Sequence, residues 1–561
     1  MINNVVVNAL KIINGYLNQN YSNKELLIIH DEINNIIGEV FEEYKSLKKY
    51  YTYEEMQEVL ATLNEKESIR KNKGVYYTPI DVVEFILINS VKQVCNILKP
   101  NNLHVLDLNG IPYSTLCYKK TIYDPCCGSG VFLLAALDLK LNLLDLHHAT
   151  ITNDKINKVV ETIKGNDLNI DSIIITKLRL LLYILHRYGV EKIKGISKIL
   201  NSNFESYDYV EDISRRKVKY DIIIGNPPYV EDAKSESKPL KKYGNIYANV
   251  LENAAMQLKT NGVLGFIIPL SYVSTPRMKG IRDELYEVIP EQYILSYADR
   301  PDCLFTSVHQ KLCILIGKNK KYKNKKVFTG NYKYWYKNER KKLFDDAEVV
   351  QNNNIKDDYI PKLGTIIDVG VYKKIERQRK PILNLMERGN TPLYLNMRAA
   401  FWIKVFLNEH NGSEYKAFKC KSDDEKNYCM CLLSSSLFWW YWICVSDCWH
   451  ITRKELIGFK IPEIKDYTEI NKLAKKLEDQ LEKTKLYVGT KQTEYEYKHK
   501  SCVKTIHQID DYINNLFGLT EEESLYIKNF AYRYRIGGGA EDECNWFVCW
   551  MWWIIFRLYE R

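Results

Sequence analysis

Two short apolar runs in the first half of the chain constrain its fold most strongly. Residues 220–224 read YDIII, and residues 262–268 read GVLGFII. Strands that are buried on both faces have continuous apolar runs, whereas a strand with one solvent-exposed face alternates polar and apolar residues. Helical patterns separate these runs between residues 71 and 320. This alternation predicts a doubly wound α/β domain with a mostly parallel sheet.

The flanking parts differ in pattern. Residues 1–70 carry apolar side chains at helical spacing and predict a helical N-terminal segment. Between Lys318 and Lys342, eleven Lys or Arg residues stand against one acid, which places a domain boundary near residue 320. Beyond it we distinguish three further ranges: an irregular, aromatic-rich α+β region at 321–465, a helical region at 466–540, and an aromatic tail of unassigned role at 541–561.

The composition excludes some classes of protein. The 561 residues include no apolar run of 18 or more, so we expect no membrane-spanning helix, and the N-terminus has no secretory signal pattern. The 14 cysteines are scattered without a disulfide framework, which fits a reducing cytoplasm. The net charge of +10 is compatible with a polyanionic partner.

The first motif that carries chemistry is the segment 124–133, DPCCGSGVFL, which follows an apolar strand and opens a helical run. A glycine-rich turn between a strand and a helix lets a cofactor approach the backbone closely. The N–H groups of the helix N-terminus then face that ligand. The Lys-Ser/Thr pair of a phosphate-binding loop is absent, which disfavours a nucleoside triphosphate. An ordinary tight turn is the alternative interpretation.

The second motif is the segment 165–167, GND, which precedes a helical stretch at 173–185. An acid at the end of the next strand, here Asp167, can accept hydrogen bonds from both hydroxyls of a ribose. It lies 43 residues after Asp124, more than the roughly 20 of a simple dinucleotide fold, so an additional helix must intervene. A solvated loop acid is the alternative.

The third motif, Asn226-Pro227-Pro228-Tyr229, directly follows the apolar strand at 222–224. The strand places it at the carboxyl edge of the sheet, where ligands bind in such folds. The two prolines fix the backbone. The Asn226 amide oxygen and the Pro227 carbonyl can then each accept one hydrogen from an exocyclic amine, and Tyr229 offers a face for stacking. A proline-stiffened loop is the alternative.

The segments GVYYTP (74–79), DPCCGSG and NPPY, in this order, resemble the gamma class of N6-adenine DNA methyltransferases of restriction–modification systems. The resemblance implies a Rossmann-like catalytic domain at 71–320 and S-adenosyl-L-methionine as methyl donor. It further implies double-stranded DNA as substrate, with the target adenine flipped out of the helix. The region 321–465 would recognise the DNA target, and a cognate restriction endonuclease would act separately.

The resemblance also assigns residues. The cofactor would be held by eight of them: Thr78, Asp124, Cys126, Gly128, Gly130, Asp167, Asn203 and Phe204. Among these, Thr78 would contact the methionine carboxylate and Asp167 the ribose. Asn203 stands where the family usually has an acid that contacts the cofactor adenine. The segment 226–229 would be catalytic, and Tyr229 and Phe305 would stack on the two faces of the target base.

Several alternatives remain open. A bifunctional restriction–modification enzyme would need a nuclease site, for which Glu43-Tyr44-Lys45 is the one suggestive N-terminal fragment. Methylation of a protein glutamine is also compatible with NPPY, and a non-catalytic DNA-binding module would not bind the cofactor. The cysteines and histidine between 429 and 450 have no standard zinc spacing, so we predict buried cysteines and no metal. The basic run 318–342 is either a DNA-backbone contact or a solvated loop.

Overall fold

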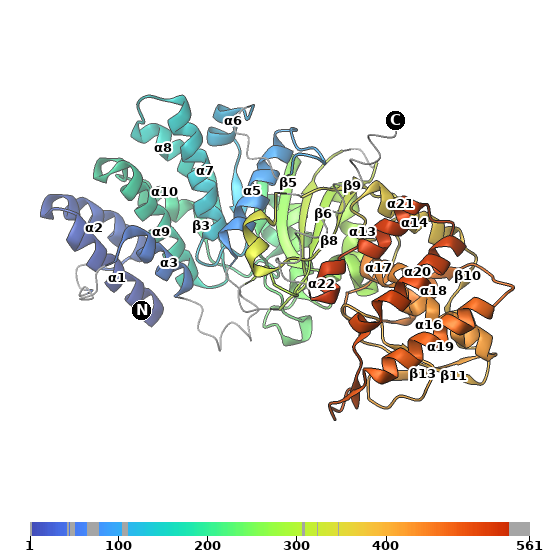
Figure 1. Ribbon diagram of the computed structural model, residues 1–561. Coiled ribbons are helices and arrows are strands. Elements are labelled where there is room, and N and C mark those ends of the chain that lie inside the picture. The colour runs from blue at the N-terminus through green and yellow to red at the C-terminus, as the bar shows by residue number, and fades with distance from the viewer. Residues whose placement is uncertain are drawn as a thin grey trace, which may run out of the picture. The chain divides into compact units, whose positions relative to one another are not determined.

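The computed structural model describes residues 3–41, 44, 51–63, 78–103, 110–305, 309–321, 324–345 and 347–537. The chain forms two compact units, which are drawn in Figure 1. The first comprises Met1–Lys333 and Lys337–Asp358, and the second comprises Tyr334–Tyr336 and Tyr359–Arg561.

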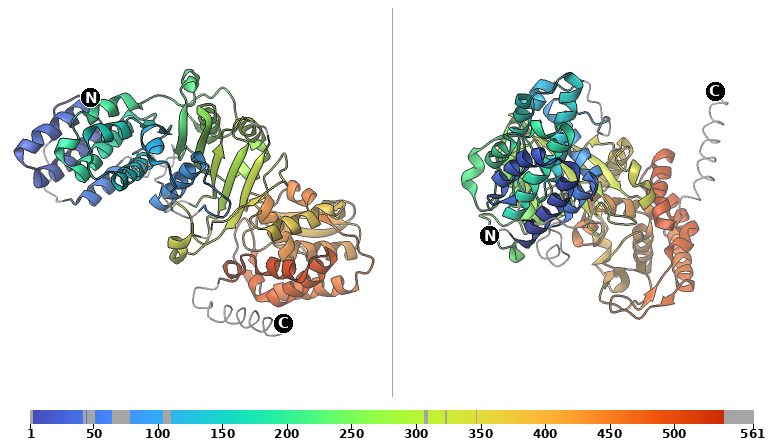
Figure 2. Two further views of the ribbon diagram at one scale, coloured as in Figure 1. Left: turned by 90° about the horizontal axis from the view of Figure 1, so that it is seen from above. Right: turned by 90° about the vertical axis from the view of Figure 1, so that its left-hand side faces the viewer.

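The first unit is built on a nine-stranded sheet with the strand order β3-β2-β1-β4-β5-β7-β6-β8-β9. Its strands are β1 (Ile122–Asp124), β2 (Ile163–Asn166), β3 (Phe204–Glu205), β4 (Tyr220–Gly225), β5 (Leu258–Pro269), β6 (Glu291–Tyr297), β7 (Leu312–Lys318), β8 (Lys326–Lys333) and β9 (Val350–Gln351). The five strands from β3 to β5 in this order are all parallel, and β7 is antiparallel to both of its neighbours. Figure 2 shows these strands side by side. The predicted doubly wound, mostly parallel sheet is therefore confirmed.

Helices connect and cover these strands. They are α5 (Ile80–Val94), α6 (Tyr113–Tyr118), α7 (Val131–His147), α8 (Asn153–Val160), α9 (Ile170–Tyr188), α10 (Ile196–Asn203), α11 (Ile246–Met256), α12 (Ser271–Ser274) and α13 (Lys279–Val288). Helix α5 packs on β4, β5 and β7, while α7 packs on β1 and β2 and lies between α5 and α9. Helix α8 between β1 and β2 accounts for the long spacing between the first two motifs.

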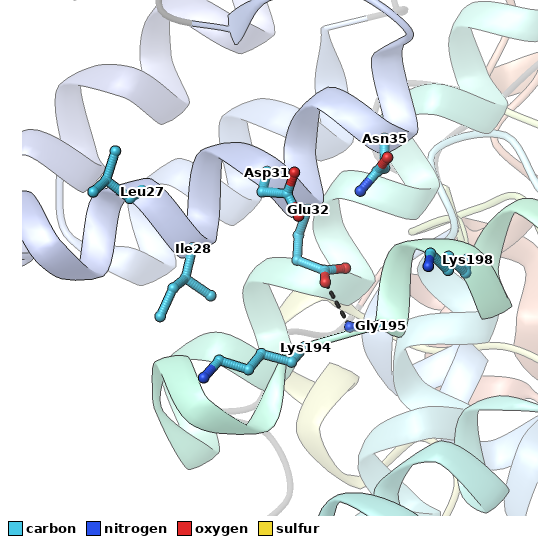
Figure 3. Close-up of a pocket in the computed structure, with 8 residues that line it drawn as sticks. All are labelled: Leu27, Ile28, Asp31, Glu32, Asn35, Lys194, Gly195 and Lys198. Carbon is cyan, nitrogen blue, oxygen red and sulfur yellow. Dashed lines mark hydrogen bonds between the residues drawn. The ribbon is translucent and has the colours of Figure 1, made fainter.

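Three N-terminal helices belong to the same unit: α1 (Asn4–Asn20), α2 (Asn23–Ile37) and α3 (Tyr53–Thr62). They pack on α9 and α10, which confirms a helical N-terminal segment. The Glu32 carboxylate of α2 accepts hydrogen bonds from the backbone N–H groups of Gly195 and Ser197, at the start of α10. A carboxylate there satisfies N–H groups that have no partner within the helix. Figure 3 shows this junction beside a pocket of about 430 Å³.

The second unit combines helices with small antiparallel sheets. Its helices are α14 (Ile366–Arg377), α15 (Leu383–Met386), α16 (Asp423–Ser434), α17 (Ser436–Val445), α18 (Arg453–Gly458), α19 (Thr468–Lys483), α20 (Val503–Leu516), α21 (Glu521–Asn529) and α22 (Tyr532–Ile536). Its largest sheet has the order β12-β11-β13, with β11 (Thr391–Asn396), β12 (Val405–Phe406) and β13 (Tyr415–Cys420). Every residue of α17 is buried.

In the described parts of the chain, no single helix has the length and apolar composition that a bilayer-spanning segment needs. The pair α16–α17 meets both requirements when taken together, but it bends by 62° at the junction.

The central sheet extends past the boundary that the charge shift places near residue 320. Strand β8 is hydrogen-bonded to β6, and β9 is hydrogen-bonded to β8. The two compact units accordingly divide close to residue 358. The basic run 318–342 thus contributes a strand to the first unit. The functions assigned to the ranges after residue 320 stay predictions, and the tail 541–561 lies outside the described residues.

The contact between α5 and β5 gives a test of the packing. A Cβ at Gly265 would lie 2.1 Å from Ser90 Oγ and 3.1 Å from Ile86 Cγ2, both on α5. We expect Gly265→Ala to lower the free energy of unfolding by about 1–3 kcal/mol, because overpacking a buried contact costs that much. Urea unfolding measures the loss. The double variant Ser90→Ala, Gly265→Ala removes the closest atom and should recover part of it. Equal stability of the two variants would contradict the described contact.

Candidate active site

The loops that follow β1 and β2 are joined at the carboxyl edge of the sheet. The backbone N–H of Gly128 donates to Asp167 Oδ2 at 2.9 Å, and that of Cys127 donates to the carbonyl of Asn166 at 2.9 Å. The segment DPCCGSG therefore lies directly against GND. Asp167 Oδ1 also accepts a bond from the N–H of Asn169 at 2.8 Å. Two backbone donors thus fix the orientation of a half-buried carboxylate beside the glycine-rich turn.

The glycine-rich turn is held from below by α9. Gly128 and Gly130 have φ values of +53° and +80°, which L side chains rarely adopt. Thr176 Oγ1 donates to the carbonyl of Gly128 at 2.9 Å, and the Arg179 guanidinium donates to the carbonyl of Ser129. Arg179 is itself fixed by Gln57 of α3, whose Oε1 accepts from Arg179 Nε at 3.0 Å. The turn is therefore rigid, and α7 begins immediately after it.

Asn166 of the GND segment received no role of its own from the sequence, although its side chain connects three loops. Its Nδ2 donates to the carbonyls of Pro125 and Tyr207 at 3.0 and 3.1 Å, and its Oδ1 accepts from the N–H of Tyr207 at 3.1 Å. The side chain is 1% exposed. An amide can donate and accept at once, so it joins the loops after β1, β2 and β3. Its position just before Asp167, at the end of a strand, was the available signal.

Asp124 joins the first motif to the third. Its side chain is buried, and its Oδ1 accepts from the N–H of Cys126 at 3.0 Å. A Cβ at Gly225, the residue before NPPY, would lie 2.6 Å from the same oxygen. Burial raises the pKa of Asp124 well above its ordinary value, and the Asp167 charge adds to this, while the Cys126 N–H opposes it. Only a residue without a Cβ permits this approach between β1 and β4.

Thr78 and Asn226 are in direct contact. Asn226 Nδ2 donates to Thr78 Oγ1 at 3.0 Å, and Thr78 is buried just before α5. The bond orients the planar amide, with its nitrogen facing Thr78. Residues 74–77 of the GVYYTP segment lie outside the described residues. The first and third motifs and the end of this segment thus come together.

Two aromatic rings face each other beside NPPY. The Tyr229 and Phe305 centroids are 6.4 Å apart, with 28° between the ring planes. Tyr229 OH donates to the carbonyl of Ile267 at 2.9 Å, which anchors that ring to β5. Carbon atoms pack at about 3.5 Å, so a planar ring placed between two others needs a separation of about 7 Å. The rings would therefore have to separate before a flat heterocycle could lie between them.

Asn203 lies elsewhere than its predicted role requires. Its Nδ2 donates to the carbonyls of Val160 and Ile163 at 2.9 and 3.0 Å, and its Oδ1 accepts from Lys164 Nζ at 2.8 Å. These partners stand at the amino end of β2, away from the glycine-rich turn. The predicted contact with a cofactor adenine does not fit this placement, because the side chain is committed to joining α10 to β2.

The two residues after Asn203 have different surroundings: Phe204 lies in the core, and Glu205 lies at the carboxyl edge of the sheet. Phe204 is buried, with its ring 2.8 Å from the position of a Cβ at Gly165, so it packs against β2. Glu205 ends β3 in register with Asn166 and is exposed, 3.0 Å from Arg215. Glu205 is therefore the acid that reaches the carboxyl edge of β3. Sequence reasoning missed it because the two-residue strand left the register uncertain by one or two positions.

The cysteines of the first motif and of the second unit lie in buried surroundings. Burial raises the pKa of Cys126 and Cys127 well above the ordinary value, so both thiols stay protonated and are poor nucleophiles. In the second unit, Cys429, Cys431 and Cys444 are buried. Across the described residues, no cluster of three or more His, Cys, Asp or Glu side chains could hold a metal ion. Glu43 and Lys45 of the nuclease alternative lie outside the described residues.

Residues 161–300 match the Eco57I restriction-modification methylase family. The matched segment runs from β2 to β6 and includes Asp167 and NPPY. Neither the DPCCGSG turn nor Thr78 lies inside it.

Curated relatives align over part of the chain. The type II methyltransferase M.BstVI of Geobacillus stearothermophilus is 25% identical over 203 residues, covering 34% of this chain and 36% of the relative. The modification methylase CviBIII of Paramecium bursaria Chlorella virus NC1A is 30% identical over 156 residues, covering 26% and 38%. The type II restriction enzyme and methyltransferase RM.Eco57I of Escherichia coli is 22% identical over 324 residues, covering 49% and 31%. The chain therefore aligns to between 31% and 38% of the length of these relatives.

One solved structure shares the fold over most of the chain. The Type IIL restriction-modification enzyme MmeI, determined in complex with DNA, superposes with a TM-score of 0.50 at 13% identity. The similarity covers 88% of this chain and 83% of that one. At this identity the likeness shows the arrangement of the elements alone.

The contact of the glycine-rich turn with α9 is testable by comparing two glycines. Gly130 and Gly38 have similar left-handed backbones, with φ/ψ of +80°/+26° and +72°/+13°, but a Cβ at Gly130 would lie 2.6 Å from Thr176 Cγ2, whereas one at Gly38 meets nothing within 4 Å. Both alanine variants carry the backbone cost of about 1–2 kcal/mol. We expect Gly130→Ala to lose about 1–3 kcal/mol more in urea unfolding, because it also overpacks. Equal losses would mean that α9 does not press on the turn.

Proposed function

We propose that this chain is an S-adenosyl-L-methionine-dependent DNA methyltransferase that modifies the N6 amine of adenine, as the modification enzyme of a restriction–modification system. The observation that carries the proposal is the orientation of Asn226. Its amide is held by Thr78. The NPPY segment to which it belongs follows Gly225, which lies against Asp124 of the first motif, and carries Tyr229, whose ring pairs with Phe305. A methyl-donor site and an amine-acceptor site would then share one edge of the sheet.

The donor-side residues fit S-adenosyl-L-methionine. A Cβ at Gly128 meets nothing within 4 Å, so the turn leaves open space over its backbone. Asp167 accepts from the backbone N–H groups of Gly128 and Asn169, and an acid at the end of this strand is placed to accept hydrogen bonds from ribose hydroxyls. Thr78 and the segment 124–130 would hold the methionine part. The bound cofactor supplies an electrophilic methyl group on a sulfonium.

The acceptor-side residues account for the rest of the reaction. The adenine amine is a poor nucleophile, because its lone pair is delocalised into the ring. Hydrogen bonds from the amine to Asn226 Oδ1 and to the Pro227 carbonyl would favour a more tetrahedral nitrogen and would stabilise the positive charge that develops on it. Stacking on Tyr229 and Phe305 would offset the few kcal/mol that extrusion of the base costs. Alignment of the reacting atoms would supply much of the remaining rate.

The test is to express the chain in a bacterial host without adenine methylation and to sequence its DNA with a method that reads modified bases. We expect N6-methyladenine at one recurring sequence. Asn226→Ala is the matched control: turnover should fall about 100- to 1000-fold, while calorimetry finds S-adenosyl-L-methionine bound as tightly as by the unaltered chain. Absence of any modified base with the unaltered chain would refute the proposal, and full turnover by Asn226→Ala would refute the role of that amide.

Thr78 gives a second, graded prediction. Thr78→Val keeps the shape of the side chain but removes the oxygen that accepts from Asn226, so the amide can rotate away from its working orientation. We expect the kcat of methyl transfer to fall about 10- to 100-fold. Thr78→Ser keeps that oxygen and should retain most of the rate. If the two variants lose the same activity, the hydroxyl does not orient Asn226.

A further inference from the structure

Arg340 reaches from a 3-10 helix, η6 (Lys337–Lys342), to two other parts of the first unit. Its Nε and Nη2 donate to the two carboxylate oxygens of Asp81 at 2.6 and 2.9 Å. Its Nη1 donates to the carbonyls of Cys303 and Leu304 at 3.2 and 3.0 Å. All four contacts come from one planar guanidinium, whose rigid set of donors matches a carboxylate on one side.

The two ends of this bridge adjoin the two halves of the candidate site. Leu304 directly precedes Phe305, whose ring faces Tyr229. Asp81 stands in the first turn of α5, three residues after Thr78, and its Oδ1 also accepts the N–H of Val82 at 2.9 Å. The guanidinium therefore ties the backbone before the stacking ring to the helix that starts beside Asn226.

The segment that carries Arg340 is fixed to the same helix by ring packing. Phe344 stacks on Phe85 of α5 with 4.6 Å between centroids and 23° between planes. It also meets the ring of Tyr297, at the end of β6, edge to face at 5.7 Å. The Arg340 and Asp81 side chains are 23% and 34% exposed, so solvent only partly screens the pair. Arg340 is thus part of an ordered junction.

We propose that Arg340 is a positioning residue for the target base, which sets the place of Phe305 by holding the Cys303 and Leu304 carbonyls against Asp81. This inference rests on the proposed function, since it assigns the slot between Tyr229 and Phe305 to a flipped base. The 6.4 Å separation of the rings must widen to admit a base. Arg340 fixes the position of Phe305, while α5 holds Thr78. The guanidinium therefore limits how far the rings separate and sets where the amine of the base lies relative to Asn226.

The chain contains a closely matched control for this bridge. Arg187 donates to Asp145 through Nε and Nη2 at 3.0 and 2.5 Å, and the two side chains are 22% and 35% exposed. Arg187 is 17 residues after Ile170 in α9, about 25 Å along the helix from its start at the site edge. Both Arg187 bonds reach the one oxygen Oδ2 of Asp145, and the guanidinium also donates to Tyr183 and Asn142. Arg187→Lys therefore also breaks a set of guanidinium bonds that includes a paired donation to a carboxylate, at a similar exposure but far from the rings.

The experiment compares Arg340→Lys, Arg187→Lys and the unaltered chain in two measurements. Lysine keeps the charge but lacks the planar set of donors, so it cannot hold Asp81 and both carbonyls together. We expect hydrogen–deuterium exchange of the peptide spanning 300–305 to speed up in Arg340→Lys alone. In tritiated methyl transfer to plasmid DNA without adenine methylation, we expect kcat to fall about 100-fold in Arg340→Lys, with the dissociation constant for S-adenosyl-L-methionine unchanged.

The two measurements separate the possible failures. Unchanged exchange in Arg340→Lys would show that the bridge does not hold this backbone and would overturn the inference. Faster exchange with an unchanged kcat would also overturn it, because the ring would then not need the brace. A general loss of activity in both lysine variants would point to stability and likewise contradict it. If the unaltered chain transfers no methyl group, the proposed function fails, while the exchange measurement still decides whether Arg340 holds the loop.

Discussion

The parallel pairing of β1 with β4 is the constraint on which the candidate site depends. Ile122 pairs with Ile222 and Tyr123 with Ile223, so two strands about 100 residues apart in the chain end side by side. Neighbouring strands lie about 4.8 Å apart. The glycine-rich turn and NPPY therefore leave the sheet at the same edge, and the Asp124 carboxylate lies against Gly225 between them. The contacts of DPCCGSG with GND depend in the same way on the parallel pairing of β1 with β2.

The parts of the fold that the sequence predicted are those written in local patterns. The continuous apolar runs gave β4 and β5, and the helical stretch at 173–185 falls inside α9. Among the predicted site residues, Asp124, Gly128, Asp167, Thr78 and Asn226 come together at one edge. Such motifs work because strand, turn and helix lie within a few residues of one another.

What the sequence did not predict depends on contacts between distant segments. Asn166 and Arg340 act through bonds to residues tens to hundreds of positions away, and neither stands in a repeated pattern. The role predicted for Asn203 does not match its position, because β3 has only two residues and the register of β3 is set by its pairing with β2. The sheet continues past residue 320 because β8 pairs in parallel with β6. The basic residues that flank β8 gave no indication of this pairing.

The support of Arg179 by Gln57 changes how the N-terminal helices should be regarded. Gln57 bonds both the guanidinium and the backbone carbonyl of Arg179, which in turn holds the carbonyl of Ser129. The N-terminal helical segment therefore supports the glycine-rich turn through Arg179. A fragment that kept the nine-stranded sheet but started after α3 would expose the face of α9 that packs on the N-terminal helices. It would also loosen the glycine-rich turn. A form of the first unit without Gln57 thus lacks the two bonds that hold Arg179 from α3.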